Sequence, residues 1–146
     1  MFARILLAVG GPEASLEPAR VAGQLAAALG SSLTVVSVYR QTPSALGDPY
    51  YSERLAPRLA QAQGTLQEAA EIIRQTGAAE PELDPLEGEP AERISALVRE
   101  RVFDLVVMGT HRRGRLGAAL LGSVSSGVAA RAGVPVLVVP GSDGEP

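Results

Sequence analysis

Five short apolar runs alternate with four longer amphipathic segments from one end of this 146-residue chain to the other. The runs are rich in Val, Leu and Ile on successive residues, as in strands that are covered on both faces. Strands that alternate with helices need crossover connections, which are right-handed and leave the strands parallel. The pattern therefore predicts an α/β fold with a doubly wound, five-stranded parallel sheet and four helices.

Prolines and apolar runs indicate where each strand lies in the sheet. Pro81 and Pro85 in the third run suit only a sheet edge, because proline cannot donate to a ladder. The first run, Arg4–Val9, and the Val106–Met108 part of the fourth run have apolar residues for both faces of a sheet and suit its centre, which predicts the strand order 3-2-1-4-5. The expected strands are Arg4–Val9, Ser32–Val38, Glu80–Leu86, Val102–Met108 and Val134–Val139. The expected helices are Glu13–Leu29, a segment that follows Arg40–Tyr51 and ends near Thr76, a segment that opens at Glu89-Pro90, and Ser123–Ala132.

The length of the chain suits one hydrophobic core. We expect a single domain over residues 1–140 and a flexible C-terminal tail over 141–146. The N-terminal apolar run is followed at once by glycines, which favours a buried strand over a secretory signal. No stretch approaches the roughly 20 apolar residues that cross a bilayer. These features predict a cytoplasmic protein without a membrane partner, and a net charge of -3 gives no sign of a nucleic-acid partner.

Missing residue types limit the chemistry that the chain can carry. The chain contains no Cys, which excludes disulfides, thiolate nucleophiles and cysteine-ligated metals. Every basic residue is Arg, so a Walker-type P-loop and Schiff-base chemistry are excluded as well. His111 is the single histidine, which rules out a multi-histidine metal centre. We predict no catalytic residue and no metal ligand.

Ligands of doubly wound sheets bind beyond the carboxyl ends of the strands, where the winding reverses. Gly109 ends the fourth expected strand, where the lack of a side chain lets the backbone approach a ligand. Gly122 and Ser123 begin a helix, where N–H groups and a hydroxyl point at an anion. Ser125 either caps this helix or reaches a phosphate. The spacing therefore predicts an anion site at the carboxyl edge of the sheet.

Several motifs occur together in the order of a known family. They are the segment VVMGTHRRGRLGAALLGSVSSGVAARAGVPVLVVP (Val106–Pro140), the first strand and turn ILLAVGGPEAS, the strand Leu33–Val38 and the helix start at Gly88-Glu-Pro-Ala-Glu. Together they resemble the universal stress protein family over nearly the whole chain. The resemblance implies an adenine nucleotide alpha hydrolase-like fold and an adenine-nucleotide (ATP) binding or sensing function in a stress response.

The resemblance also implies which residues meet the nucleotide. The backbone at the end of the second strand, Val38, would meet the adenine. Two positions depart from the family pattern and indicate a degraded site: Gly10 replaces an aspartate, and Arg112 replaces the second glycine of the signature. Arg112 either donates to the phosphates or fills the site, and both interpretations stay open. The implied nucleotide-binding residues are Ala8, Val9, Gly10, Val38, Met108, Gly109, Thr110, Arg112, Gly122, Ser123, Val124 and Ser125.

The implied ligand is ATP or another adenine nucleotide, with Mg²⁺ as its companion ion, and no tightly bound cofactor is expected. A dedicated catalyst is not expected, although slow ATP hydrolysis stays open. The alternative function is a homodimeric stress-related interaction module that does not bind nucleotide. In either case we expect a homodimer through Val134–Val139, because an apolar edge strand with unpaired backbone groups invites pairing with a second copy. No other protein partner is predicted.

Overall fold

The structure is a computed structural model that describes residues 1–10, 16–40, 50–109 and 123–140. Their elements are β1 (Arg4–Ala8), α1 (Leu16–Leu29), β2 (Ser32–Tyr39), α2 (Tyr50–Gln75), β3 (Glu82–Glu87), α3 (Pro90–Arg101), β4 (Leu105–Gly109), α4 (Ser123–Arg131) and β5 (Val136–Val139). All neighbouring strands pair in parallel, in the order β3-β2-β1-β4-β5. The predicted fold class and strand order are confirmed.

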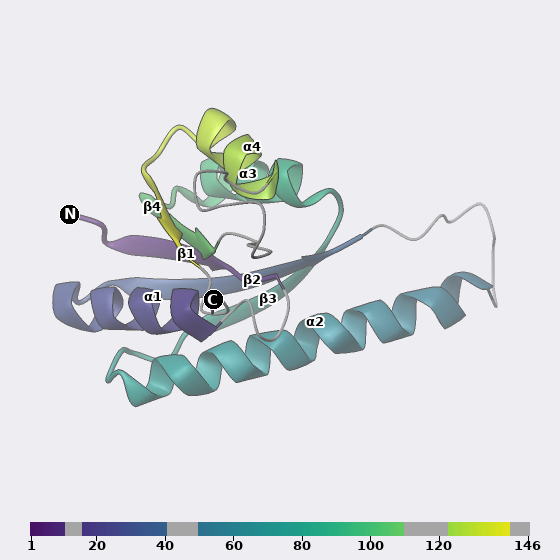
Figure 1. Ribbon diagram of the computed structural model, residues 1–146, viewed down its shortest axis with the longest axis horizontal. Helices are drawn as coiled ribbons and strands as arrows, with labels where there is room; N and C mark the ends of the chain where they lie inside the picture. Colours follow the sequence, from purple (N-terminus) through teal and green to yellow (C-terminus); the bar gives the residue numbers. More distant parts are fainter. Residues whose placement is uncertain (11–15, 41–49, 110–122, 141–146) are drawn as a thin grey trace.

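Helices cover both faces of the sheet, with α1 and α2 on one side and α3 and α4 on the other (Figure 1). Successive side chains of a strand point to opposite faces. Leu7 and Val35 accordingly pack in the cluster under α1 and α2, whereas Leu6 and Val36 pack in the cluster under α3 and α4. All four side chains are fully buried, which explains why apolar residues follow one another directly in these strands.

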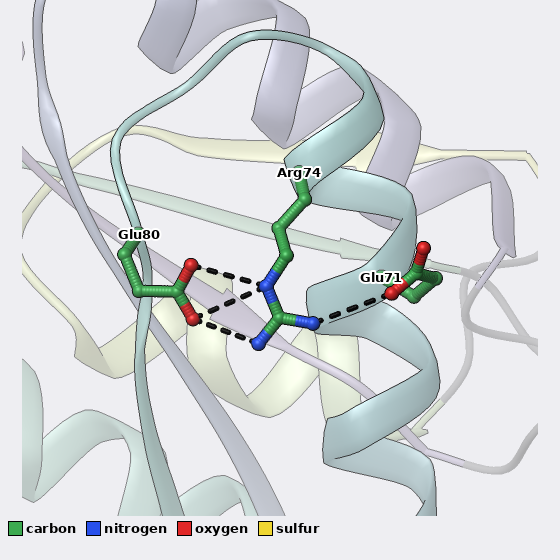
Figure 2. A network of polar contacts seen from close by, with 3 residues as sticks. All are labelled: Glu71, Arg74 and Glu80. Carbon is green, nitrogen blue, oxygen red and sulfur yellow. Dashed lines mark hydrogen bonds and ion pairs between the residues drawn. The ribbon is translucent and has the colours of Figure 1, made fainter.

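The helix α2 is the longest element, and Figure 1 shows its N-terminal turns running beyond the end of the sheet. Its C-terminal half is anchored by a buried stripe that includes Leu66, Ala70 and Ile73. At the C-terminal end, Arg74 Nη2 lies 2.7 Å from Glu80 Oε2, and Arg74 Nη1 lies 3.3 Å from Glu71 Oε1 (Figure 2). This network ties the end of α2 to the segment that leads into β3.

The fourth strand begins later than the sequence predicts. Val102 was expected in a strand, but it has a left-handed conformation (φ 57°) and its N–H donates to Val98 O, which closes α3. The requirement to end the helix therefore overrides the strand preference of valine, and the strand starts at Leu105. The neighbouring edge strand, β5, starts at Val136. Just before it, the carbonyl of Pro135 accepts a hydrogen bond from Val106 N.

Some sequence predictions fall on residues outside the described ranges. They are the start of the first helix at Glu13, the loop after Gly109 and the tail 141–146. None of the helices in the described part of the chain combines the length and the apolar composition needed to cross a membrane.

Candidate functional site

The carboxyl ends of β1 and β4 bring several predicted site residues together. Ala8 and Met108 are direct partners in the parallel ladder, and Gly109 follows as the partner of Val139. Ala8, Met108 and Val124 of α4 pack in the same hydrophobic cluster. The first turn of α4, which begins at Ser123, is thus anchored beside the central strands, at the edge where doubly wound sheets bind ligands.

The ladder between β1 and β2 stops at Val9. The Val9 N–H donates to Val36 O at 2.9 Å, and no hydrogen bond joins Val38 to Val9 or Gly10, all of which the structure describes. On the other side of β2, Tyr39 O accepts from Gly88 N at 2.9 Å. Because successive peptide groups of a strand point to opposite sides, the N–H and C=O of Val38 point toward the β1 side. Val38 therefore presents one N–H donor and one C=O acceptor to the space past the carboxyl end of β1.

A cavity of about 350 Å³ opens beside this backbone edge, between β2 and α2. Its volume lies within the usual range of about 300–1,000 Å³ for small-molecule sites. Gly10 and Val38, two of the predicted residues, belong to its wall. The lining residues are Gly10, Ser37, Val38, Tyr39, Arg40, Arg58, Gln61, Ala62 and Thr65.

Two buried hydroxyls, those of Ser37 and Thr65, lie in this lining. Thr65 Oγ1 donates to Gln61 O at 3.1 Å, as is common for a threonine inside a helix. The Ser37 hydroxyl makes no hydrogen bond within the described part of the chain. Within the described ranges, Ser95 Oγ is the only unpartnered side-chain oxygen that has no contact with solvent. The Ser37 oxygen is also unpartnered among those residues but is not of that kind, so it is accessible from the cavity.

Two arginines contribute to the cavity wall, and Arg58 has interaction partners of its own. Arg58, which is half-buried, donates from Nη1 to Arg40 O at 3.0 Å and so joins α2 to the end of β2. The lining residues include two arginines and no carboxylate in the part of the chain that the structure describes. No group of three or more His, Asp or Glu within the described ranges is arranged to hold a metal ion.

Carboxylates with a lowered pKa lie elsewhere, near the amino ends of the strands. Glu82, at the start of β3, has its pKa lowered by the hydrogen bond from Arg101, whose Nη2 lies 2.7 Å from Glu82 Oε1. Thr34 Oγ1 donates to the same oxygen at 3.2 Å. This network joins α3, β2 and β3 at the end of the sheet opposite the cavity, so it stabilises the fold without entering the site.

The structure describes only some of the other predicted site residues. Thr110, Arg112 and Gly122 lie outside the described ranges. Ser125 is buried within the first turn of α4 and has interaction partners of its own.

Sequence reasoning missed the contribution of α2. Arg58, Gln61, Ala62 and Thr65 are spaced i, i+3, i+4 and i+7, so they share one face of the helix. This polar interruption beside the apolar stripe was the signal that could have found them.

The parallel sheet in the order 3-2-1-4-5, with two helices on each face and a site at the carboxyl edge, is the adenine nucleotide alpha hydrolase-like fold. The universal stress protein family model matches residues 1–140. The "Universal stress protein in QAH/OAS sulfhydrylase 3′region" of Thermus aquaticus is 41% identical over 139 residues, which cover 95% of this chain and 99% of that protein. The chain belongs to the universal stress protein family.

Solved structures agree with this assignment. A universal stress protein crystallised in complex with cAMP is 29% identical, with a TM-score of 0.70 over 94% of this chain and 97% of that one. The universal stress protein UspA of Lactobacillus plantarum has a TM-score of 0.81 at 24% identity, over 94% of this chain and 97% of that one, and supports the fold.

Proposed function

We propose that this protein binds or senses an adenine nucleotide in the cytoplasm as part of a stress response, and that it is not a dedicated catalyst. The open backbone edge of Val38 beside the cavity carries the proposal. One N–H donor and one C=O acceptor on the same residue match the acceptor N1 and the amino group of adenine. The cAMP complex of a relative at 29% identity supports an adenine nucleotide as the ligand class.

The rest of the nucleotide would extend from Val38 toward β4. Gly109 allows close approach of the ligand, and the N-terminal end of α4 offers N–H groups and a favourable dipole to phosphates. Gly10 offers no side chain to the nucleoside, where the family resemblance leads us to expect an aspartate. One lost hydrogen bond costs about 0.5–1.5 kcal/mol, so we expect binding about tenfold weaker than with that contact, but still measurable.

Isothermal titration with ATP tests the proposal on the intact protein. Val38→Pro removes the N–H donor and should abolish or strongly weaken binding, whereas Val38→Ala keeps the backbone and should bind as the unmodified protein does. Circular dichroism establishes that both variants are folded. An absence of heat with millimolar ATP, together with no thermal stabilisation by ATP, would contradict the proposal.

The same titration tests the two interpretations of Arg112. If Arg112 donates to the phosphates, Arg112→Ala weakens ATP binding; if its side chain fills the site, the same substitution strengthens binding. Unchanged affinity would remove Arg112 from the proposed site.

We also propose a homodimer through β5, in a nucleotide-binding protein or in an interaction module that has lost the ligand. The two edges of the sheet differ. The edge strand β3 carries Pro85 and the acids Glu82, Asp84 and Glu87, which discourage pairing with another chain. The opposite edge, β5, is VLVV, with Leu137 39% exposed. A two-fold contact would cover this apolar edge in a closed assembly.

A further inference from the structure

We propose that Gly127 of α4 is a positioning residue for the phosphates of the nucleotide, because its missing side chain lets the N-terminal part of α4 lie close to α3. The inference rests on the proposed function, since it assumes that the phosphates lie at the N-terminal end of α4. The evidence for a ligand lies at the other end of the site, where the buried Ser37 hydroxyl lines the cavity without a hydrogen-bond partner among the described residues. Gly127 is not one of the predicted nucleotide-binding residues, and it acts through the helix that carries it.

Gly127 faces Ala91, in the first turn of α3, at a distance that leaves no room for a second methyl group. A Cβ atom on Gly127 would lie 2.8 Å from Ala91 Cβ, and no other atom outside α4 in the described part of the chain lies within 4 Å of that position. Carbon atoms that are not bonded to each other pack at about 3.5–4.0 Å. An alanine at position 127 would therefore force the two helices apart by several tenths of an ångström.

Ala91 is held in place, so α4 has to make the adjustment. Ala91 is buried and follows Pro90 in the first turn of α3. The Glu89 side chain caps that turn, since one of its carboxylate oxygens accepts from Glu92 N at 2.9 Å. A methyl group also has no alternative rotamer with which to move aside.

The C-terminal half of α4 is held more firmly than its first turn. Arg99 Nη1 on α3 donates to Arg131 O at the end of α4, at 3.1 Å. In the middle of the helix, Val128 is fully buried in the cluster under α3 and α4, whereas Val124 in the first turn is only partly buried. A clash at Gly127 is therefore relieved most easily by a movement of the first turn away from α3.

Such a movement displaces the N–H groups that the proposed function gives to the phosphates. The N-terminal end of a helix acts on an anion through the N–H groups and the dipole of its first turn, and the effect falls off within that turn. The Val38 peptide, which would hold the base, belongs to β2 and lies outside the contact between α3 and α4. We therefore expect binding of the phosphates to weaken while binding of the base is retained.

Isothermal titration with ATP and with adenosine, on the full chain, separates the two effects. Gly127→Ala should raise the Kd for ATP about tenfold, as for the loss of one hydrogen bond to a charged group, and should change the Kd for adenosine less than about twofold. Ala91→Gly removes the methyl group that stands in the way, so the double variant Ala91→Gly/Gly127→Ala should recover the ATP affinity of the unmodified protein. Gly23→Ala is the matched control, because it overpacks the contact between α1 and α2 instead and should leave the ratio of the two Kd values unchanged.

Gly127→Ala should remain folded, as circular dichroism can establish. Alanine favours a helix more than glycine does, and this gain offsets part of the overpacking cost. An unfolded variant would contradict the inference, because the proposed response to the clash is a movement of the first turn alone.

The outcomes of the titrations separate this inference from the proposed function. If ATP binds the unmodified protein and Gly127→Ala leaves its Kd unchanged, or if the affinities for ATP and adenosine fall equally, the inference is overturned and the proposed function stands. If the double variant binds ATP as weakly as Gly127→Ala does, the contact with Ala91 is not the cause and the inference is again overturned. If the unmodified protein binds neither ligand, both are overturned.

Discussion

Gly23 of α1 lies directly against Thr76, which follows the end of α2: a Cβ atom on Gly23 would lie 2.7 Å from Thr76 Oγ1 and 3.3 Å from the Cα of Ile73. Thr76 cannot easily turn away, because its hydroxyl donates to Ile73 O at 2.6 Å. Gly23→Ala should therefore destabilise the protein by about 1–2 kcal/mol, since the overpacking cost exceeds the gain in helix propensity. Urea unfolding followed by circular dichroism measures the change.

Gly64 is the matched control, because it lies inside α2 and a Cβ there would meet nothing within 4 Å. Gly64→Ala should stabilise the protein by about 0.5–1 kcal/mol through helix propensity alone. If the two substitutions shifted stability in the same direction, the close α1–α2 contact would not be the cause.

Val102 is expected to be a position where glycine stabilises. The residue is 72% exposed and has a φ of 57°, so it contributes little burial while adopting a conformation unfavourable for a branched side chain. The left-handed conformation costs about 1–2 kcal/mol in a residue with a Cβ atom, so Val102→Gly should raise the free energy of unfolding by about 1 kcal/mol. Val102→Ala keeps the Cβ atom and should change stability by only a few tenths of that figure. A destabilised glycine variant would contradict this interpretation of the helix end.

Glu82 should make stability depend on pH in the acid range. The hydrogen bond from Arg101 lowers the pKa of Glu82 in the folded protein below its ordinary value of 4.5. A depressed folded-state pKa contributes stability above the ordinary value, and this contribution is lost as pH falls through the folded-state pKa. Unfolding in urea from about pH 6 to 3 should therefore show a shallower decline in Glu82→Gln than in the unmodified protein.

The control for Glu82 is Glu100→Gln on α3, where the carboxylate is exposed and forms no ion pair with the described residues. Its pH profile should follow that of the unmodified protein. Because Glu82 is largely exposed, the difference should also shrink in high salt. Identical profiles for Glu82→Gln and the unmodified protein at low salt would rule out the ion pair as a source of acid sensitivity.

The β5 edge predicts a dimer that one charge disrupts. Light scattering on the 15.1 kDa chain at high micromolar concentration should give about twice that mass. Leu137→Asp, or Asp at Val136 or Val138, should yield monomer, because a charge would be buried without a partner at the contact. Leu16→Asp is matched in exposure, at 38% against 39% for Leu137, and should remain dimeric. A monomer mass for the unmodified chain would remove the proposed contact.

Much of the fold was predictable because the position of a strand in the sheet depends on the residues of that strand itself. Continuous apolar runs such as Ile5–Ala8 are central strands because both faces are covered, and Pro85 marks an edge because it lacks an N–H. Val102 was assigned wrongly because its strand preference is local, whereas its conformation is set by where α3 ends.

The candidate site was harder to predict than the fold. Gly10 and Val38 were named from the family resemblance, and both line the cavity. The opposite wall comes from Arg58 to Thr65, at least twenty residues after Val38 in the chain, and depends on how α2 crosses the sheet. The polar face of α2 marks these residues in the sequence, but no short-range pattern indicates that they lie opposite Val38.

The open peptide of Val38 has a consequence for how such a site can change over evolutionary time. Its donor and acceptor belong to the main chain, so no codon change at this position removes both, and only a change to proline removes the donor. Changes in ligand preference must therefore come from substitutions of the surrounding side chains, above all those of α2 and the residue at position 10. A contact made this way tolerates mutation at its own residue while its ligand preference is open to change from a different element.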